Sequence, residues 1–257
     1  MISYFRDGRL YEAESFLSAV KLDSADCPVI AAVGAGGKTS TLRRLAEEYA
    51  SSGRKAIVLT TTHMREETTP WSCVAEEEEW LREGTVLLDQ VKKCLEQYGQ
   101  VWIGTKAKKG KMSSVPETIL KEIEKWKIPL LVEADGARML PLKVPGEQEP
   151  VILPQTTHVF SVYGMDALDQ KLEEICFRSE KAAELLGKMP EDKVTEEDLV
   201  KLACHEQGGR KGCLKQAEYV VVLNKADTKE LQERACKIAK CLYENGINNI
   251  FVTSYML

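Results

Sequence analysis

A glycine-rich turn followed by a lysine and two hydroxyl residues is the part of this 257-residue chain best suited to chemistry. The apolar run 28–33 (PVIAAV) leads into GAGGKTS, and a helical pattern begins at Lys38. Glycines at such a turn let backbone N–H groups converge without Cβ clashes, and the helix N-terminus adds positive potential, so the turn is typical of a phosphate site. We expect Lys38 to reach the outer phosphates of a nucleotide and the Thr39 hydroxyl to ligate Mg²⁺. The predicted binding residues are Gly34, Ala35, Gly36, Gly37, Lys38, Thr39 and Ser40.

This turn departs from the full phosphate-loop signature at one position. The signature GxxxxGK[S/T] needs a glycine where this chain has Ala32, so the match is the shorter GxxGKT. The lysine that marks the ParA-like variant of the loop would fall at Val33, which disfavours that subclass. A GGK triplet occurs by chance in many proteins, but its place between a strand and a helix favours a phosphate site.

Two carboxylates stand at the end of another buried strand candidate. The apolar run 129–132 (PLLV) continues into Glu133, Ala134 and Asp135. An acid at the carboxyl end of a parallel strand faces the crevice in which nucleotide phosphates bind, where it can hold Mg²⁺ directly or through water. We therefore predict that Lys38, Glu133 and Asp135 are catalytic residues, that Thr39 and Asp135 are the metal ligands, and that the other acid orients water. A polar turn with a helix cap is the alternative interpretation of these acids.

A third motif bears on the base of the nucleotide. The buried strand candidate 219–223 (YVVVL) ends in the NKxD tetrapeptide 224–227. The Asp227 carboxylate can accept both the N1–H and the exocyclic amine of guanine, a pair of donors that adenine lacks. Asn224 is expected to tether neighbouring loops and the base edge, and the stem of Lys225 to cover the ring plane.

The end of the last strand candidate supports the same interpretation. Residues 252–254 (VTS) resemble the short loop that donates a backbone N–H to guanine O6, which adds Ser254 to the predicted base-binding residues. NKxD is by itself a common loop sequence, but the order of the three motifs along the chain favours GTP, with ATP as the possible alternative.

Other polar groups have weaker assignments. Residues 60–63 (TTTH) follow the second strand candidate, and their hydroxyls either contact Mg²⁺ or the terminal phosphate or form an ordinary β-branched strand end. The basic stretch 106–111 (KAKKGK) is either a solvated loop or a loop that closes over phosphates. None of the eight cysteines has CxxC spacing, so a zinc site is disfavoured even at Cys204-His205 with Cys213, and reduced thiols are favoured.

The elements that must position these groups alternate along the chain. Short apolar runs separated by helical patterns predict an α/β fold of P-loop NTPase type, with a mostly parallel sheet flanked by helices in three layers. We expect one nucleotide-binding domain over 1–257, with an extra helix in about residues 1–25 and an inserted proline-rich segment, 138–157, that stays extended. Strands are predicted at 28–33, 55–60, 101–104, 129–133, 158–162, 219–223 and 250–253, and helices at 38–51, 76–82, 89–98, 116–126, 179–187, 195–203 and 228–244.

Composition limits the class of protein. There are 35 Lys and Arg against 40 Asp and Glu, a net charge of −5, which argues against a nucleic-acid-binding protein. No apolar stretch approaches the roughly 20 residues that span a bilayer, and no signal peptide is visible. We therefore expect a cytoplasmic protein that binds neither membrane nor nucleic acid. The oligomeric state stays open.

Together the motifs resemble the YqeC-type family. Members of this family are described as selenium-dependent molybdenum hydroxylase accessory proteins, also called selenium cofactor biosynthesis proteins. The resemblance covers most of residues 28–257 and is weaker in the first 25. It lies in AAVGAGGKTSTLRRLAEE (31–48), TTTHM (60–64), VEADGARMLPLKVPGEQEPVILP (132–154), VYGMDA (162–167) with Arg178, and VVVLNKAD (220–227).

The resemblance implies a P-loop protein similar to SIMIBI-class GTPases that helps to mature a selenium-containing molybdenum hydroxylase. It names a pathway and no reaction. Lys143 and Glu149, in the resembling stretch, are either part of a pocket for a second substrate or partner or a surface ion pair. The residues to which the resemblance gives phosphate, Mg²⁺ or acidic-motif roles are Gly34, Gly37, Lys38, Thr39, Glu133, Asp135 and Arg138.

Two other functions stay open. The GxxGKT loop and the TTT strand end also resemble Mur-type ligases, so an ATP-dependent ligase or kinase could use the same loop, although no separate ligase-sized domains are visible and NKAD is then unexplained. A non-hydrolysing chaperone that delivers a cofactor could use the nucleotide as a switch. The expected partners are a nucleoside triphosphate and a molybdenum hydroxylase or its cofactor-assembly machinery.

Overall fold

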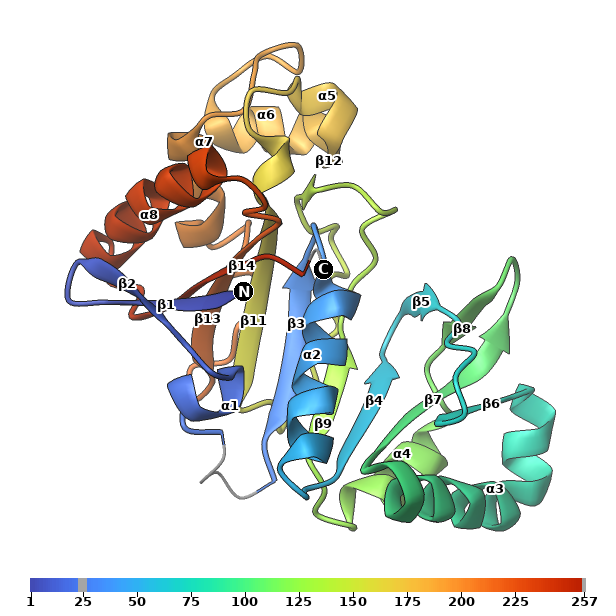
Figure 1. Cartoon of the computed structure of the whole chain (residues 1–257). Helices are drawn as coiled ribbons and strands as arrows, with labels where there is room; N and C mark the ends of the chain where they lie inside the picture. The colour runs from blue at the N-terminus through green and yellow to red at the C-terminus, as the bar shows by residue number, and fades with distance from the viewer. Residues whose placement is uncertain (23–26, 256–257) are drawn as a thin grey trace.

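A twelve-stranded sheet forms the centre of the computed structural model, which describes residues 1–22 and 27–255 (Figure 1). Its strands are β1 (Ile2–Arg6), β2 (Arg9–Glu12), β3 (Val29–Gly34), β4 (Ala56–Thr60), β5 (His63–Arg65), β6 (Ser72–Ala75), β7 (Gln100–Ala107), β8 (Lys111–Ser113), β9 (Leu130–Glu133), β11 (His158–Gly164), β13 (Glu218–Asn224) and β14 (Asn249–Thr253). The order across the sheet is β2-β1-β14-β13-β11-β3-β9-β4-β7-β8-β5, and β6 also pairs with β7. The neighbours from β14 to β7 are all parallel, and antiparallel ribbons extend both ends of this run.

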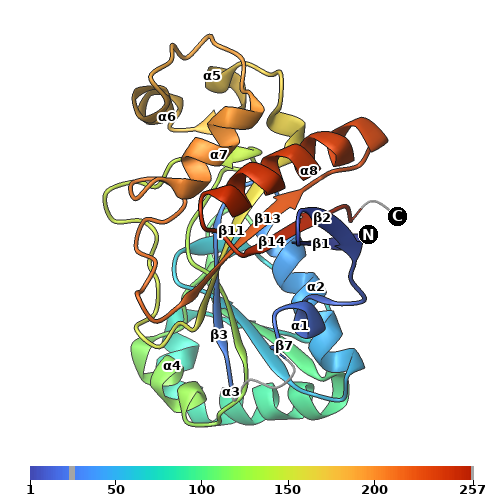
Figure 2. The ribbon, with the colours of Figure 1, turned by 90° about the vertical axis from the view of Figure 1, so that its left-hand side faces the viewer.

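Helices cover both faces of this sheet. They are α1 (Phe16–Ala19), α2 (Lys38–Ser51), α3 (Glu77–Tyr98), α4 (Glu117–Glu124), the 3-10 turn η1 (Met165–Ala167), α5 (Leu172–Ile175), α6 (Ser179–Leu186), α7 (Glu196–Cys204) and α8 (Lys229–Glu244). A second, two-stranded parallel sheet joins β10 (Leu142–Lys143) to β12 (Cys176–Phe177). The two views of the ribbon show α2 on one side of the central strands and α7 and α8 beyond the strands β11, β13 and β14 (Figures 1 and 2).

The layers follow from the alternation of side chains along each strand. Ile30 and Ala32 of β3 point to the cluster formed with α1 and α2, whereas Ala31 and Val33 point to the cluster formed with α5 to α8. Further along the sheet, Ile57 points to a third cluster, with α3 and α4. Buried on both faces, these strands are continuous apolar runs, as parallel sheets require. The α/β prediction with three layers is confirmed.

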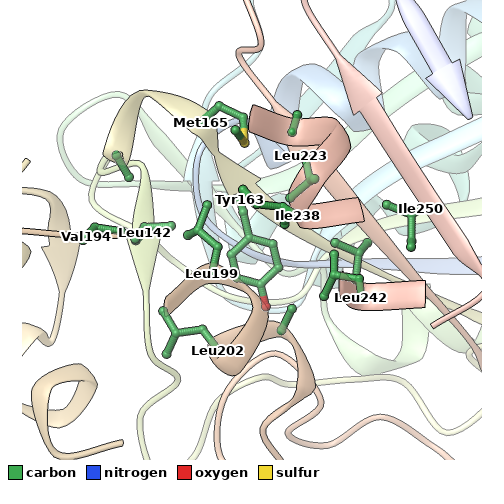
Figure 3. Packing of buried hydrophobic residues seen from close by; sticks show 14 of the residues in the cluster. Leu142, Tyr163, Met165, Val194, Leu199, Leu202, Leu223, Ile238, Leu242 and Ile250 are labelled. Atoms are coloured by element: carbon green, nitrogen blue, oxygen red, sulfur yellow. The ribbon is translucent and has the colours of Figure 1, made fainter. Parts of the chain in front are cut away.

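The cluster beneath α7 and α8 lies on the face of the sheet opposite α1 and α2. Figure 3 shows Tyr163 of β11 at its centre, with aliphatic side chains of α7 and α8 around the ring. The Tyr163 ring is buried, and its hydroxyl accepts a hydrogen bond from Ser161 Oγ at 3.0 Å. This packing fixes the end of β11, whose Val162 carbonyl contacts the glycine-rich turn.

The amino-terminal helix is much shorter than predicted. Residues 2–12 form the hairpin β1–β2, and helix appears only in the four residues of α1; residues 23–25 of the predicted helix lie outside the described residues. Asp7 and Gly8 both have positive φ, 49° and 79°, which closes a two-residue turn between the strands. The hairpin pairs with β14, and this long-range partner overrides the helical pattern of an isolated segment.

Three other differences concern the far half of the sheet. The two helices predicted at 76–82 and 89–98 form one helix, α3, with non-helical backbone at Glu83. The basic stretch 106–111 includes the end of β7 and the start of β8 and so forms a hairpin connection. The short strands β5, β6 and β8 were not predicted, because three or four residues give too little periodicity to recognise.

The proline-rich segment 138–157 runs back along the sheet with little regular structure apart from β10. It is tied to the sheet by main-chain hydrogen bonds from Val151 N–H to Ala134 O (2.9 Å) and from Thr157 N–H to Val29 O (2.8 Å). Within the described ranges, no helix is long and apolar enough to cross a membrane.

Candidate functional site

The glycine-rich turn, the acidic pair and the NKxD turn meet at one edge of the sheet. β3, β9 and β13 belong to the same parallel run, so their carboxyl ends, at Gly34, Glu133 and Asn224, open on the same side. The helix α2 starts directly beyond β3 at Lys38. The sequence order strand, loop, helix is therefore realised at the topological position where α/β proteins bind ligands.

The amides of the turn fall into two groups. Gly34 N–H donates to Asp135 Oδ2 (3.1 Å), Ala35 N–H to Val162 O (2.9 Å) and Gly36 N–H to Leu140 O (3.2 Å). These three hydrogen bonds fix the shape of the turn. In the described part of the chain, the next four amides, which open helix α2, have no acceptor; they belong to Gly37, Lys38, Thr39 and Ser40. Free amides at a helix N-terminus with no side-chain cap can bind an anion.

Lys38 folds back over its own loop. Its Nζ donates to Gly34 O at 2.8 Å and lies 3.1 Å from Asp135 Oδ1, in ion-pair contact outside hydrogen-bond geometry. Burial alone would lower the pKa of Lys38, but the charges of Asp135 and Glu133 outweigh it and raise the pKa above its ordinary value. The lysine is therefore a fixed positive charge beside the free amides.

Thr39 contacts Glu133, and this pair can serve as a metal site. Thr39 Oγ1 donates to Glu133 Oε2 at 2.6 Å. Burial raises the pKa of Glu133, although the Lys38 charge and the Thr39 hydrogen bond act against it. Both oxygens are hard donors of the kind that Mg²⁺ takes, usually together with waters and substrate phosphates. Among the described residues there is no cluster of three or more His, Cys, Asp or Glu that could hold a metal without such help.

Asp135 lies on the other side of this acidic strand end. Its side chain is fully buried between two lysines, with Oδ1 facing Lys38 and Oδ2 lying 3.0 Å from Lys143 Nζ. The structure thus brings Glu133 to the Thr39 hydroxyl and holds Asp135 against ammonium groups. Metal ligation by Asp135 stays a prediction, and Glu133 is the better placed acid.

The three threonines after β4 use their hydroxyls in different ways. Thr60 Oγ1 donates to Glu133 O (2.8 Å), and Thr61 Oγ1 donates to Val151 O (2.7 Å). Thr62 Oγ1 is buried without a hydrogen-bond partner among the described residues. The Thr60 and Thr61 hydroxyls therefore hold the acidic strand and the proline-rich segment in place. Of the three threonines, only Thr62 has a hydroxyl that is not used in such a contact.

Asn224, the first residue of the NKxD turn, connects the glycine-rich turn with the end of β14. Its Nδ2 donates to Gly36 O at 2.7 Å, and its Oδ1 accepts from Thr253 Oγ1 at 2.8 Å. A Cβ on Gly37, whose φ is 129°, would lie 2.1 Å from Asn224 Nδ2. The absence of a side chain at Gly37 is therefore what lets the amide reach the loop.

Asp227 and Ser254 also lie side by side. Ser254 Oγ donates to Asp227 Oδ1 at 2.5 Å, which orients the carboxylate. The Ser254 N–H, however, donates to Met1 O at 3.1 Å because β1 pairs with β14, so this amide is already occupied. Lys225 has φ 63° and its Nζ donates to Asp166 Oδ2 at 2.6 Å.

Lys143 and Glu149 form part of a buried ionic cluster. Lys143 Nζ donates to Gly136 O (2.6 Å) and to Glu149 Oε2 (2.8 Å), and Arg178 Nη1 donates to the same carboxylate oxygen at 2.8 Å. Burial would raise the pKa of Glu149, but the hydrogen bonds from Lys143 and Arg178 lower it to about 2. Since the Lys143 side chain is fully buried, a surface ion pair does not describe it.

Sequence reasoning missed three contributors to the site. Asp166 is the partner of Lys225, Thr253 is the second anchor of Asn224, and Leu140 supplies the carbonyl that caps Gly36. Asp166 lies in the VYGMDA stretch, Leu140 in the EADGAR…LPLK stretch and Thr253 in the VTS stretch, so each stood in a motif that had been singled out. Their particular contacts depend on how the strands and loops pair.

A groove larger than the small cavity beside Gly34 exists elsewhere on the molecule. It has a volume of about 500 Å³ and lies between α1 and the carboxyl-terminal half of α2, where Glu14, Arg44, Glu47 and Glu48 line it. Size alone would select this groove. The glycine-rich turn instead offers free amides, a fixed cation and a hydroxyl–carboxylate pair, so we place the candidate site there.

Fold and site thus define an α/β protein with a glycine-rich strand–loop–helix turn, a buried acidic strand end and an NKxD turn at one edge of its sheet. The chain belongs to the YqeC family: the family model described as YqeC protein matches residues 30–180. A protein of Escherichia coli (strain K12) described as uncharacterized protein YqeC is 31% identical over 227 residues, which is 87% of this chain and 86% of the relative.

Proposed function

We propose that this protein is a Mg²⁺-dependent GTP-binding protein, with GTP hydrolysis as its activity. The observation that supports the proposal most is the Asn224 side chain, which joins the phosphate-loop candidate at Gly36 to the β14 end at Thr253. A nucleoside triphosphate held by the free amides would therefore have the NKxD turn beside it. Hydrolysis requires little covalent chemistry from the protein, because phosphoryl transfer is promoted mainly by positioning and charge stabilisation.

In this proposal each group has one task. The free amides of residues 37–40 and the Lys38 ammonium would hold phosphate oxygens, so Lys38 would exchange its contact with Gly34 O for the ligand. Thr39 and Glu133 would hold Mg²⁺, which when bound neutralises phosphate charge. Asp135 would keep Lys38 charged and oriented, and Asp227 would accept from the base.

The deciding experiment is a titration of GTP and of ATP with and without Mg²⁺. We expect Mg²⁺-dependent binding with GTP preferred, and no measurable binding by Lys38→Ala. Lys125→Ala, which removes an exposed lysine from the end of α4, is the matched control and should bind normally. Full binding by Lys38→Ala would refute the phosphate-loop assignment.

A preference for ATP would instead support the ligase or kinase alternative. One observation makes this arm of the titration necessary: the Ser254 amide, a predicted donor to guanine O6, already donates to Met1 O. Guanine would need another donor at that position, whereas adenine would not.

We further propose that the protein acts as an accessory factor in maturation of a selenium-dependent molybdenum hydroxylase. This part of the proposal rests on the family resemblance. It also assumes that the α/β protein acts in the cytoplasm. GTP turnover should rise when the apo-hydroxylase is added. Equal turnover with and without the hydroxylase would count against this role, and binding without any turnover would favour the switch-type chaperone.

A further inference from the structure

A group of basic side chains surrounds Phe177, outside the proposed nucleotide site. The guanidinium carbons of Arg138 and Arg178 lie 4.5 Å and 4.2 Å from the centre of the Phe177 ring. Lys181 Nζ donates to Pro145 O at 3.0 Å, and Lys211 Nζ donates to the carbonyls of the neighbouring residues 146 and 147. The two arginines therefore lie against the Phe177 ring, and the two lysines bind the neighbouring turn at residues 145–147.

Positive charge at this place exceeds negative charge. Glu149 is shared by Lys143 and Arg178. Within residues 1–22 and 27–255, none of Arg138, Lys181 and Lys211 has a carboxylate oxygen within 4.0 Å. Burial, followed by the neighbouring Lys181 charge, lowers the pKa of Lys211, although Glu147 and Glu149 act against both.

The backbone holds these cations in place. Arg138 and Met139 have consecutive positive φ values, 49° and 63°, and Arg178 has φ 67° as the residue before α6. Such conformations are strained for side chains other than glycine and often occur at functional sites. α6 begins at Ser179 with no side-chain cap, so its first amides add positive potential on the same side.

A small cavity of about 10 Å³ lies between Lys211 of this cluster and the glycine-rich turn. Lys143, Pro145, Pro150 and Lys211 line it, and it reaches Gly34. The segment that carries Arg138 also touches the turn, through the bond from Gly36 N–H to Leu140 O. A ligand on the cluster would therefore lie close to the nucleotide without sharing its amides.

We propose that Arg138, Phe177, Arg178, Lys181 and Lys211 form a second binding site, for a small molecule that carries a phosphate or carboxylate group. Guanidinium groups bind such planar or tetrahedral oxyanions through paired N–H donors, and their faces stack on flat groups. The site goes beyond the proposed nucleotide site and does not depend on it. It gives the buried Lys143–Glu149 pair a structural task, which is to fix Arg178 beside the ring.

The test uses the full wild-type chain, because removing Lys38 would disturb the ionic chain that runs through Asp135, Lys143 and Glu149 to Arg178. Inorganic phosphate and succinate are titrated separately by calorimetry, against sodium chloride at equal ionic strength. We expect saturable binding of at least one probe, which raises Tm by mass action, and a loss of about tenfold or more in affinity on adding Arg138→Ala. Arg138 is exposed and makes no ion pair in the described residues, so its removal should leave the fold intact. The two probes separate a phosphate site from a carboxylate site.

The matched control adds Lys201→Ala, which removes an exposed lysine of α7 and should leave probe affinity unchanged. Equal weakening by Lys201→Ala and Arg138→Ala, or responses no larger than with chloride, would overturn the second site. Displacement of the probe by GTP would also overturn it, since the probe would then occupy the nucleotide loop. GTP binding measured in parallel on the wild type and on Arg138→Ala tests the proposed function separately.

Discussion

Charged side chains of alternating sign run from the glycine-rich loop towards α6. Lys38 contacts Asp135, Asp135 contacts Lys143, Lys143 contacts Glu149 and Glu149 contacts Arg178, with distances between 2.8 and 3.1 Å. Lys38, Asp135 and Lys143 are almost wholly buried. A buried charge that loses its partner costs about 3–5 kcal/mol, so each member depends on its neighbours. The chain therefore ties the orientation of the loop lysine to residues far along the sequence.

Glu149 should make the stability of the protein depend on acid pH. Its pKa is about 2 when folded and near 4.5 when unfolded, so its contribution is complete above about pH 5 and is lost as the pH falls towards 2. Glu149→Gln should lower the free energy of unfolding at pH 7 and flatten its decline between pH 5 and 2. Urea unfolding across this range measures both. Glu147→Gln, two residues earlier and exposed, is the control; equal slopes for wild type and Glu149→Gln would contradict the prediction.

Asp227 should decide between purine bases. Its carboxylate is oriented by Ser254 Oγ and, in the proposed complex, accepts the N1–H and amine of guanine. Asp227→Asn should weaken GTP binding by about tenfold or more and favour xanthosine triphosphate relative to GTP. Competition between labelled GTP and xanthosine triphosphate measures this. An unchanged base preference would remove guanine specificity from the proposed function.

At the scale of elements, the glycine-rich turn is packed against two other loops rather than open on all sides. Its amides bond to the ends of β11 and of the proline-rich segment, and Asn224 bonds to its Gly36 carbonyl. A Cβ at Gly36 would lie 2.2 Å from Gly164 N. The end of β11, the proline-rich segment and the NKxD turn thus all contact the glycine-rich turn. A change in any of the three should therefore alter the position of the first turn of helix α2.

Gly37→Ala tests this packing. The new Cβ would lie 2.1 Å from Asn224 Nδ2 at a φ of 129°, so we expect a loss of about 1–3 kcal/mol in the free energy of unfolding and weaker nucleotide binding. Gly53→Ala, at the other end of α2, also has positive φ (73°) but meets nothing within 4 Å. It should cost only about 1 kcal/mol and leave binding intact. Chemical unfolding and GTP titration of both variants measure these effects. Equal losses of stability and of GTP binding in the two variants would show that the Asn224 contact does not cause the effect of Gly37→Ala.

At the scale of the whole molecule, the two ends of the described chain meet beside the NKxD turn. Met1 N donates to Ser254 O at 2.8 Å, and β1 covers the edge of β14 (Figure 1). The buried Phe5 anchors the hairpin, with its ring 5.9 Å from that of Tyr243 on α8. The amino-terminal hairpin is thus an integral edge of the sheet.

Phe5→Ala should show how much stability this edge contributes. Removing a fully buried phenylalanine typically costs about 3–5 kcal/mol, whereas Tyr11→Ala, in the same hairpin but half exposed, should change the free energy of unfolding by about 0.5 kcal/mol or less. Thermal and urea unfolding measure both variants. A cost for Phe5→Ala as small as that for Tyr11→Ala would mean that the hairpin is only loosely attached.

The sequence by itself determined the alternating α/β order, the core strands to within one or two residues in most cases, and helix α2 from Lys38 to Ser51. These follow from local causes: apolar runs of strand length, glycines at turns and helical periodicity. The three motifs could be placed on strand ends for the same reason, and parallel pairing then brought them to one edge.

Only the tertiary structure decided which side chain faces which. Glu133 and Asp135 are two residues apart, yet one contacts Thr39 and the other is held by two lysines. The hairpin at residues 2–12, the occupied Ser254 amide and the cations around Phe177 likewise depend on partners distant in sequence. Local pattern sets which elements form, because it acts through neighbours along the chain; contacts between elements are set by packing of the whole sheet, which no single segment encodes.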